Sequence, residues 1–397
     1  MVDVLIASDG FPPDFTGAGL RALRLAQRMS NKYNMHFQVL CISKYQDQGK
    51  FEGIEVKRIR AVKEQGIFFI FYLIQIFIKT SLFMIKNKNR IDIIHFFSFS
   101  WMNRMIILNN VLFYKKKTVL EVTLDGSDDP KSLMYVGKRN RLFRGFTKFL
   151  LKRIDKIIVG STDSLNSSLE VGIKKERVLI EPHPCDEKVF GSIKFNNKNK
   201  LRVKLDLPKD KFILLNVGRI QPRKNQFFII EALKKVNNHN IMLLFIGPYD
   251  KNDDYCNKIN KYLKINGMEK DVLFLGQKKN INEYMIAADL FVFASKKEGF
   301  PNVIAEAHTS GLPVLTTELE CITKFINAKN GIIIKSINNS EKNMLKEFSK
   351  GLNRIYNGNL LFNRSYIREQ GKKSFSTKVI DKKYLEIYNG LMHKYDA

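Results

Sequence analysis

Two carboxylates frame a short, mostly apolar segment in the C-terminal half of the chain. Glu298 and Glu306 are the first and last residues of EGFPNVIAE. The run DLFVFAS (289–295) before it has the composition of a buried strand. Asn302 is predicted to be the N-cap of a helix that stops at Gly311. Glu298 therefore precedes the helix, and Glu306 lies within it, one turn from its start.

This arrangement suits a phosphorylated sugar. The first backbone N–H groups of a helix bind phosphate, because they have no partner within the helix. A carboxylate accepts two hydrogen bonds, which fits the neighbouring hydroxyls of a ribose or a hexose. The residues expected to bind such a ligand are Glu298, Gly299, Phe300, Pro301, Asn302, Val303 and Glu306.

Two further segments could contribute to a phosphate site. In FILLNVGRIQPRKN (212–225), Gly218 permits a tight turn after a strand, and the cations of Arg219 and Lys224 follow it. Cations at the carboxyl end of a strand can neutralise a diphosphate leaving group. Near the N-terminus, SDGFPPDFTGAG places Gly17 where the backbone can approach a phosphate closely. The alternatives are solvated charges in a basic protein and a glycine turn that merely connects two elements.

Apolar runs alternate with helical patterns along the whole chain. Buried strands are predicted at 2–8, 37–43, 54–59, 91–97 and 118–124, and again at 212–218, 241–247, 271–276, 289–295 and 312–317. Helices are predicted between them, for example at 19–30 and 225–237. This β-α-β alternation predicts an α/β protein with two parallel sheets.

The predicted halves are separated by a polar, basic, asparagine-rich stretch at 189–210, typical of a linker. We therefore expect an N-terminal Rossmann-like domain over 1–190 and a C-terminal one over 191–374. The apolar residues of FSTKVIDKKYLEIYNGLM (375–392) recur at helical spacing and predict a closing helix.

Composition narrows the class of protein. The 397 residues carry a formal net charge of +28, which favours an anionic partner. The four cysteines are widely separated, with no C-x-x-C pair, as expected for a protein of the cytoplasm. The N-terminus lacks the pattern of a secretory signal. The sequence contains no D-x-D and no H-x-x-x-H, so we expect no metal cofactor.

Two segments of the N-terminal half suggest a membrane surface. The run GIFFIFYLIQIFIKTSLFMIK (66–86) is apolar but interrupted by polar residues, and it fits either a buried domain helix or a monotopic membrane contact. The stretch 138–156 predicts one basic amphipathic helix, suited to anionic lipid. An ordinary surface helix with long charged side chains is the alternative there.

The motifs together resemble those of the retaining family 4 glycosyltransferases of GT-B fold. The resemblance rests on E-G-F-P-N-V-I-A-E, on V-G-R-x-x-x-R-K and on P-P-x-x-x-G-A-G, and it covers essentially the whole chain. It implies two Rossmann-like domains facing across a cleft, with the closing helix (375–397) packed back on the first. The roles it implies are donor sugar contact by Glu298, ribose binding by Glu306, diphosphate binding by Arg219 and Lys224, and close approach by Gly17 and Ala18.

The chain departs from the family on the acceptor side. The family often has a histidine after the fifth strand, where this chain reads EVTLDGSDDP (121–130). Asp125 or Asp128 could substitute for it, or His95 could face the cleft from a neighbouring strand. The alternative for His95 is a core histidine with satisfied hydrogen bonds.

The resemblance implies a metal-independent transferase that moves a sugar from a nucleotide-diphosphate donor to a hydroxyl of a glycan or lipid-linked saccharide. The two membrane-suited segments favour an acceptor at the cytoplasmic membrane face, as in bacterial surface polysaccharide assembly. A nucleotide-sugar hydrolase or epimerase of the same fold remains an alternative. So does a polyanion-binding protein, although no nucleic-acid motif accompanies the charge.

Overall fold

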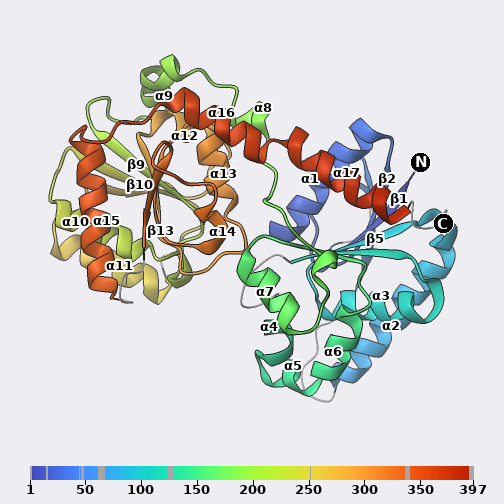
Figure 1. Cartoon of the computed structure of the whole chain (residues 1–397). Coiled ribbons are helices and arrows are strands. Elements are labelled where there is room, and N and C mark those ends of the chain that lie inside the picture. Colours follow the sequence, from blue (N-terminus) through green and yellow to red (C-terminus); the bar gives the residue numbers. More distant parts are fainter. Residues whose placement is uncertain are drawn as a thin grey trace. The chain divides into compact units, whose positions relative to one another are not determined.

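The computed structural model describes the chain except for residues 1, 15, 16, 44, 46–48, 61–67, 123–128, 251, 336–339 and 393–397. The chain forms two compact units, each built on one sheet (Figure 1). Unit 1 comprises Met1–Glu181 and Asp381–Ala397, and unit 2 comprises Pro182–Ile380.

The units meet along the chain at 181/182 and 380/381, whereas the sequence placed the boundaries at 190/191 and 374/375. The first boundary was predicted at 190/191 because the polar stretch at 189–210 is typical of a linker. The chain already joins unit 2 before it, because the backbone N–H of Cys185 donates to the carbonyl of Phe375 at 2.7 Å. The closing helix α17 (Thr377–Met392) begins within unit 2 and continues in unit 1.

Unit 1 contains an eight-stranded sheet in the order β3-β4-β2-β1-β5-β6-β7-β8, parallel except for β3. Its strands are β1 Asp3–Ser8, β2 His36–Ile42, β3 Gly49–Phe51, β4 Ile54–Ile59, β5 Ile93–Phe97, β6 Lys117–Glu121, β7 Lys156–Val159 and β8 Val178–Ile180. The five strands predicted in this half are present. The sequence patterns missed β3, β7 and β8, which are only three or four residues long.

Helices cover both faces of this sheet. One core joins the sheet to α2 (Phe68–Asn87), α3 (Trp101–Asn109) and α6 (Arg144–Leu151). The other face carries α17, whose Tyr388 contacts Phe37 and His95 of the strands. The remaining elements are α1 Gly17–Tyr33, α4 Ser132–Tyr135, α5 Lys138–Leu142, α7 Thr162–Glu170, the 3-10 helices η1 Lys88–Arg90 and η3 Lys175–Arg177, and the π-helix η2 Asn110–Tyr114. The single helix predicted at 138–156 is wrong, because α5 and α6 are separate helices that meet at Phe143.

Unit 2 contains a parallel sheet in the order β11-β10-β9-β12-β13-β14. Its strands are β9 Phe212–Val217, β10 Ile241–Ile246, β11 Val272–Phe274, β12 Leu290–Phe293, β13 Val314–Thr317 and β14 Gly331–Ile334. Its principal helices are α9 Lys198–Lys204, α10 Gln226–Val236, α11 Asp254–Ile265, α12 Ile281–Ala287, α13 Asn302–Thr309, α15 Glu341–Tyr356 and α16 Arg364–Phe375. The prediction missed only β14 here.

Alternation along the strands divides unit 2 into two cores. Leu214 of β9 joins the core formed with α10, α11 and α15, while its neighbours Ile213 and Leu215 join the core formed with α9, α12 and α13. Successive side chains of a strand point to opposite faces, so uninterrupted apolar strands need helices on both sides. The parallel sheet with covered faces follows from this pattern (Figure 1).

Candidate functional site

The order of strands in unit 2 brings two distant loops together. β9 pairs directly with β12, with Leu214 opposite Leu290 and Leu215 opposite Phe291. Both strands are parallel, so the loops that follow Val217 and Phe293 lie at the same edge of the sheet. This carboxyl edge is where ligands of open α/β sheets usually bind.

Glu298 is the centre of a cluster of charges at this edge. Its Oε1 lies 2.6 Å from Nζ of Lys224 and 2.8 Å from Nη1 of Arg223. The hydroxyl of Ser295 donates to the same oxygen at 2.6 Å. Glu298 is 8% exposed. A carboxylate this deeply buried needs opposite charge and hydrogen-bond donors, and the two loops supply them.

Backbone hydrogen bonds fix the two loops to each other. The N–H of Lys296 donates to the carbonyl of Arg223 at 2.8 Å. The guanidinium of Arg223 donates to the carbonyl of Lys297 at 2.6 Å. The sequence reasoning missed Arg223 and Ser295. Two signals could have indicated these residues. Arg223 stands next to Lys224 in the sequence, and Ser295 stands three residues before Glu298.

The predicted cations differ in environment. Lys224 is half-buried, and burial lowers the pKa of its ammonium, although the Glu298 carboxylate acts in the opposite direction. Arg219 is exposed, and its carbonyl accepts from the Gln226 side chain at 2.9 Å. Gly218, which precedes Arg219, adopts a φ of 154°. Lys224 and Arg219 therefore provide one sheltered and one accessible positive charge.

Helix α13 starts at Asn302, as predicted, but Asn302 is not its N-cap. Pro301 occupies the N-cap position without a side-chain cap, and Oδ1 of Asn302 lies 2.7 Å from Nδ1 of His183. The N-cap prediction is wrong because a histidine from another part of unit 2 competes for the asparagine side chain. The helix ends as predicted, with Gly311 at a φ of 74°.

Phe300 is a structural side chain. It is 5% exposed, and its ring contacts those of His183, Phe325 and Phe375 at centroid distances of 5.6 to 5.7 Å. This aromatic cluster fixes the turn between Glu298 and α13. The Phe300 ring is thus committed to packing, and its backbone is the part suited to a ligand.

Glu306 lies one turn inside α13 and is half-buried. Its carboxylate interacts electrostatically with the buried thiol of Cys185. Burial, and next the Glu306 carboxylate, raise the pKa of that thiol.

The N-terminal candidates belong to unit 1. Gly17 and Ala18 form the first turn of α1. Asp125 and Asp128 lie outside the described residues. The roles suggested for these four residues remain predictions.

His95 is a core residue. It has no exposed surface, and its Nδ1 lies 2.7 Å from the hydroxyl of Tyr388 in α17. Nearby, Glu121 accepts from the Tyr384 hydroxyl at 2.9 Å and pairs with Arg21 at 2.9 Å. This network attaches α17 to the sheet of unit 1. The placement agrees with a core histidine, although its hydrogen bonds are not all satisfied, since Nε2 lies 3.6 Å from Glu121 and forms no hydrogen bond with the described residues. His95 is therefore not retained as an acceptor-side group.

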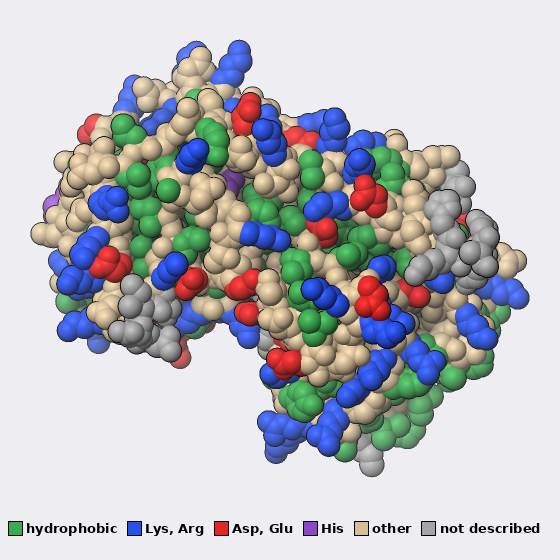
Figure 2. All heavy atoms as spheres, in the orientation of Figure 1, with side chains coloured by type: hydrophobic (Ala, Val, Ile, Leu, Met, Phe, Trp, Pro, Cys, Tyr) green, Lys and Arg blue, Asp and Glu red, His purple; other side chains and the backbone are tan. Residues whose placement is uncertain are grey.

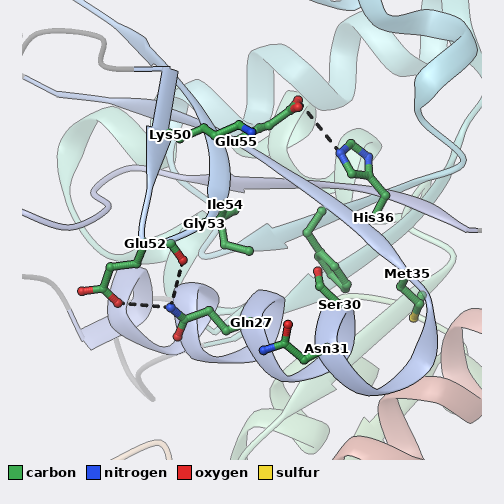
Figure 3. A pocket seen from close by; sticks show the side chains of 11 residues that line it. Gln27, Ser30, Asn31, Met35, His36, Lys50, Glu52, Gly53, Ile54 and Glu55 are labelled. Carbon is green, nitrogen blue, oxygen red and sulfur yellow. Dashed lines mark hydrogen bonds and ion pairs between the residues drawn. The ribbon is translucent and has the colours of Figure 1, made fainter.

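Unit 1 also has a pocket of about 500 Å³ that contains none of the predicted site residues (Figure 3). It lies beside the amino end of β2, and some of its polar side chains contact one another or a neighbouring residue. His36 contacts Asp3 at 2.8 Å and Glu55 at 4.0 Å, and the Gln27 side chain donates to Glu52 at 3.1 Å. Among the described residues no three His, Cys, Asp or Glu side chains gather as metal ligands would.

The site coincides with a region shared with known proteins. Residues 197–373 match the family model described as Glycosyl transferases group 1. The chain is 31% identical over 170 residues to UDP-Gal:alpha-D-GlcNAc-diphosphoundecaprenol alpha-1,3-galactosyltransferase of Escherichia coli, covering 41% of each chain. It is 28% identical to the capsular polysaccharide biosynthesis glycosyltransferase CapM of Staphylococcus aureus, covering 64% of this chain and 68% of that one. The match to the E. coli protein thus spans less than half of its length.

Solved structures extend the likeness to the whole chain. Anabaena HepE, crystallised with UDP and glucose, superposes with a TM-score of 0.75, covering 98% of this chain and all of that one at 17% identity. At this identity the likeness shows the fold alone. The predicted GT-B fold class, with two α/β units, is confirmed.

Proposed function

We propose, from the match of residues 197–373 to the model of group 1 glycosyl transferases, that the chain transfers a sugar from a nucleoside diphosphate donor to an acceptor hydroxyl. The observation that carries the proposal is the cluster formed by Lys224 and Arg223 of the loop after β9 and Glu298 of the loop that leads to the N-terminus of α13. Cations and helix-terminal amides are the groups that stabilise a departing diphosphate.

We assign the donor to this edge of unit 2. Arg219 and Lys224 hold the diphosphate. Glu306 accepts hydrogen bonds from the ribose hydroxyls, and Glu298 faces the donor sugar. In the transfer, the bond from the anomeric carbon to the diphosphate oxygen breaks, and a bond to the acceptor oxygen forms on the same face. Because the new bond forms on the face that the diphosphate leaves, the anomeric configuration is retained. The acceptor proton passes to the leaving diphosphate, and Arg219 and Lys224 neutralise its remaining charge without a required metal ion.

The proposed acceptor is a glycan or lipid-linked saccharide, met at the cytoplasmic face of the cell membrane during assembly of a bacterial surface polysaccharide. Two comparisons support this choice. The E. coli relative is named for a diphosphoundecaprenol-linked acceptor, and the S. aureus relative for capsular polysaccharide biosynthesis. Asp125 and Asp128 remain the candidates for the acceptor side.

The test is to supply radiolabelled uridine and guanosine diphosphate sugars with short-chain diphosphate-linked saccharides, and to separate the products. The proposal expects a glycosylated acceptor with the donor's anomeric configuration, at an unchanged rate in EDTA. Free sugar alone, or an epimerised donor, would identify the hydrolase or epimerase alternative instead. Loss of activity in EDTA, restored by a divalent cation, would contradict the metal-free assignment.

A further inference from the structure

Helix α2 is apolar on two opposite faces. Its inner face packs into the core of unit 1, where Ile76 and Met84 are fully buried and Phe69 is 6% exposed. Its outer face presents large apolar side chains that are each at least half exposed, namely Ile70, Phe71, Ile74, Ile78, Leu82 and Ile85. At 3.6 residues per turn these six positions form one continuous stripe. A helix that is apolar all round requires an apolar environment on both sides.

The exposed face continues beyond α2 itself. Leu112 and Phe113 of η2 are 52% and 63% exposed. The hydroxyl of Tyr114, the next residue, donates to the carbonyl of Ser81 in α2 at 3.3 Å. We call the six exposed side chains of this stripe, together with Leu112 and Phe113, the apolar face. Isolated surface apolar residues are ordinary, but a contiguous patch marks an interaction surface.

Polar contacts hold α2 against unit 1. The Asn109 amide of α3 donates to the Thr80 hydroxyl at 2.9 Å and to the carbonyl of Phe77 at 3.2 Å. Within the described residues, the segment Phe69–Arg90 is the one helix long and apolar enough to cross a bilayer. Crossing would strip Ile76 and Met84 out of the core and break these bonds. The fold instead presents α2 side-on, as a helix lying in a membrane interface does.

The surroundings of the apolar face are basic. Residues 130–154 contain no Asp or Glu, and α5, α6 and the turn after α6 expose Arg139, Arg141, Arg144, Lys148, Lys152 and Arg153. The Arg139 guanidinium lies 3.9 Å from the centroid of the Phe69 ring, so α5 contacts the start of α2. Figure 2 shows hydrophobic side chains gathered at the lower right, where Figure 1 places α2, beside Lys and Arg side chains.

We propose that the apolar face inserts in the plane of an anionic lipid bilayer, with the cations of α5 and α6 on the lipid headgroups. The proposal deepens the proposed function, on which it rests for the presence of an acceptor in that membrane. Apolar side chains next to a basic rim fit a lipid surface, because insertion buries the first and phosphate groups neutralise the second. A second copy of this chain fits less well, since it would bring two basic rims together.

The test is flotation of the full chain with phosphatidylcholine vesicles, with and without phosphatidylglycerol. The wild type should float with the anionic vesicles at low salt and be released by high salt or alkaline carbonate. The triple variant Phe71→Gln, Ile74→Gln, Ile78→Gln should bind about ten-fold or more weakly, because three apolar side chains no longer enter the interface. Since all three side chains are at least half exposed, the variant should keep its fold.

The matched control is Val203→Gln, Ile265→Gln, Leu361→Gln, which changes three exposed apolar residues of unit 2 and should float like the wild type. Trp101, the only tryptophan of the chain, packs edge to face against Phe69 and reports on this region. Energy transfer from Trp101 to a dansyl-labelled headgroup should appear with the wild type and be lost with the α2 variant. The proposal is overturned if the wild type fails to float, if the two triple variants float equally, or if sedimentation shows a wild-type dimer that the α2 variant abolishes.

These outcomes are separable from those for the proposed function. Nucleotide-sugar stabilisation of the lipid-free protein should be the same in the wild type and the α2 variant, because the apolar face belongs to unit 1. If the wild type binds a nucleotide sugar but does not float with anionic vesicles, only the proposal of a membrane-binding face is contradicted. If the wild type floats but binds no nucleotide sugar, the proposed transferase function is contradicted.

Discussion

Nζ of Lys224 lies 2.6 Å from Oε1 of Glu298, although 74 residues separate them in the chain. The contact exists because β9 and β12 are neighbours in the sheet of unit 2. The pair joins a cation suited to a diphosphate to the carboxylate that begins the EGFPNVIAE segment. Glu298 therefore organises the positive charges of the site in addition to any contact it makes with the donor sugar.

Replacing Glu298 should destabilise the protein. In Glu298→Ala, Lys224 and Arg223 lose the carboxylate that offsets the repulsion between their positive charges. Breaking a buried ion pair costs roughly 3 kcal/mol. Thermal unfolding measures the loss. Glu347→Ala is the control, because Glu347 forms an exposed pair with Lys350, and such pairs contribute less than about 1 kcal/mol. Equal shifts for the two variants would show that the cluster around Glu298 has no structural role.

Donor binding should weaken at alkaline pH. Burial lowers the pKa of Lys224 from its ordinary value of 10.5, so this ammonium loses its proton earlier than an exposed lysine. A bound diphosphate stabilises the charged form and raises that pKa again, so binding takes up a proton as the pH approaches 10.5. Calorimetry in buffers of different ionisation enthalpy should detect the uptake. Lys224→Arg should remove it, since an arginine stays charged, and proton uptake that persists in this variant would assign it to another group.

Acid should destabilise unit 2 through His308. Burial lowers the pKa of this fully buried imidazole from 6.5 to about 4. Its neutral form favours folding, so the stabilisation is complete above pH 6.5 and is lost as the pH falls through the folded value near 4. The loss amounts to about 3 kcal/mol at 1.36 kcal/mol for each pKa unit. His308→Met should flatten the dependence of unfolding temperature on pH in this window, and an unchanged slope would contradict the assignment.

Gly247 should tolerate no side chain. A Cβ at this position would lie 2.1 Å from the carbonyl oxygen of Gly218, at the turn before Arg219, and its φ is 152°. Gly247→Ala should therefore cost more than about 2 kcal/mol and displace the Gly218 turn. Gly267→Ala is the control, because a Cβ there meets nothing within 4 Å at a φ of 63°, leaving a strain of about 1 kcal/mol. Similar unfolding temperatures for the two variants would exclude the contact as the cause.

The sequence patterns predicted those features that depend on one segment of the chain alone, such as the position of a strand or a helix. The apolar runs predicted the long strands of both sheets, and EGFPNVIAE predicted where α13 starts and stops. Each of Lys224 and Glu298 was identified because it follows a strand. Their contact could not be predicted, because it depends on β9 lying between β10 and β12, an order that chain connectivity does not determine.

Tertiary competition explains the other differences. Asn302 has the residue type of an N-cap, but His183 binds its side chain, and no local pattern indicates that partner. His95 lies on an apolar strand, and its bond to Tyr388 depends on the path of α17. The exposure of the outer face of α2 was likewise hidden, since the same composition fits a fully buried helix.

The central claim is that unit 2 holds a nucleoside diphosphate sugar through its cations and Glu306. The most direct measurement is the rise in unfolding temperature caused by a panel of nucleotide sugars. A donor at about 100 times its dissociation constant should add about 2.7 kcal/mol of stability. We expect this stabilisation to be lost in Glu306→Ala and Lys224→Ala and kept in Glu347→Ala. An undiminished shift in the first two variants, or no shift with any nucleotide sugar, would contradict it.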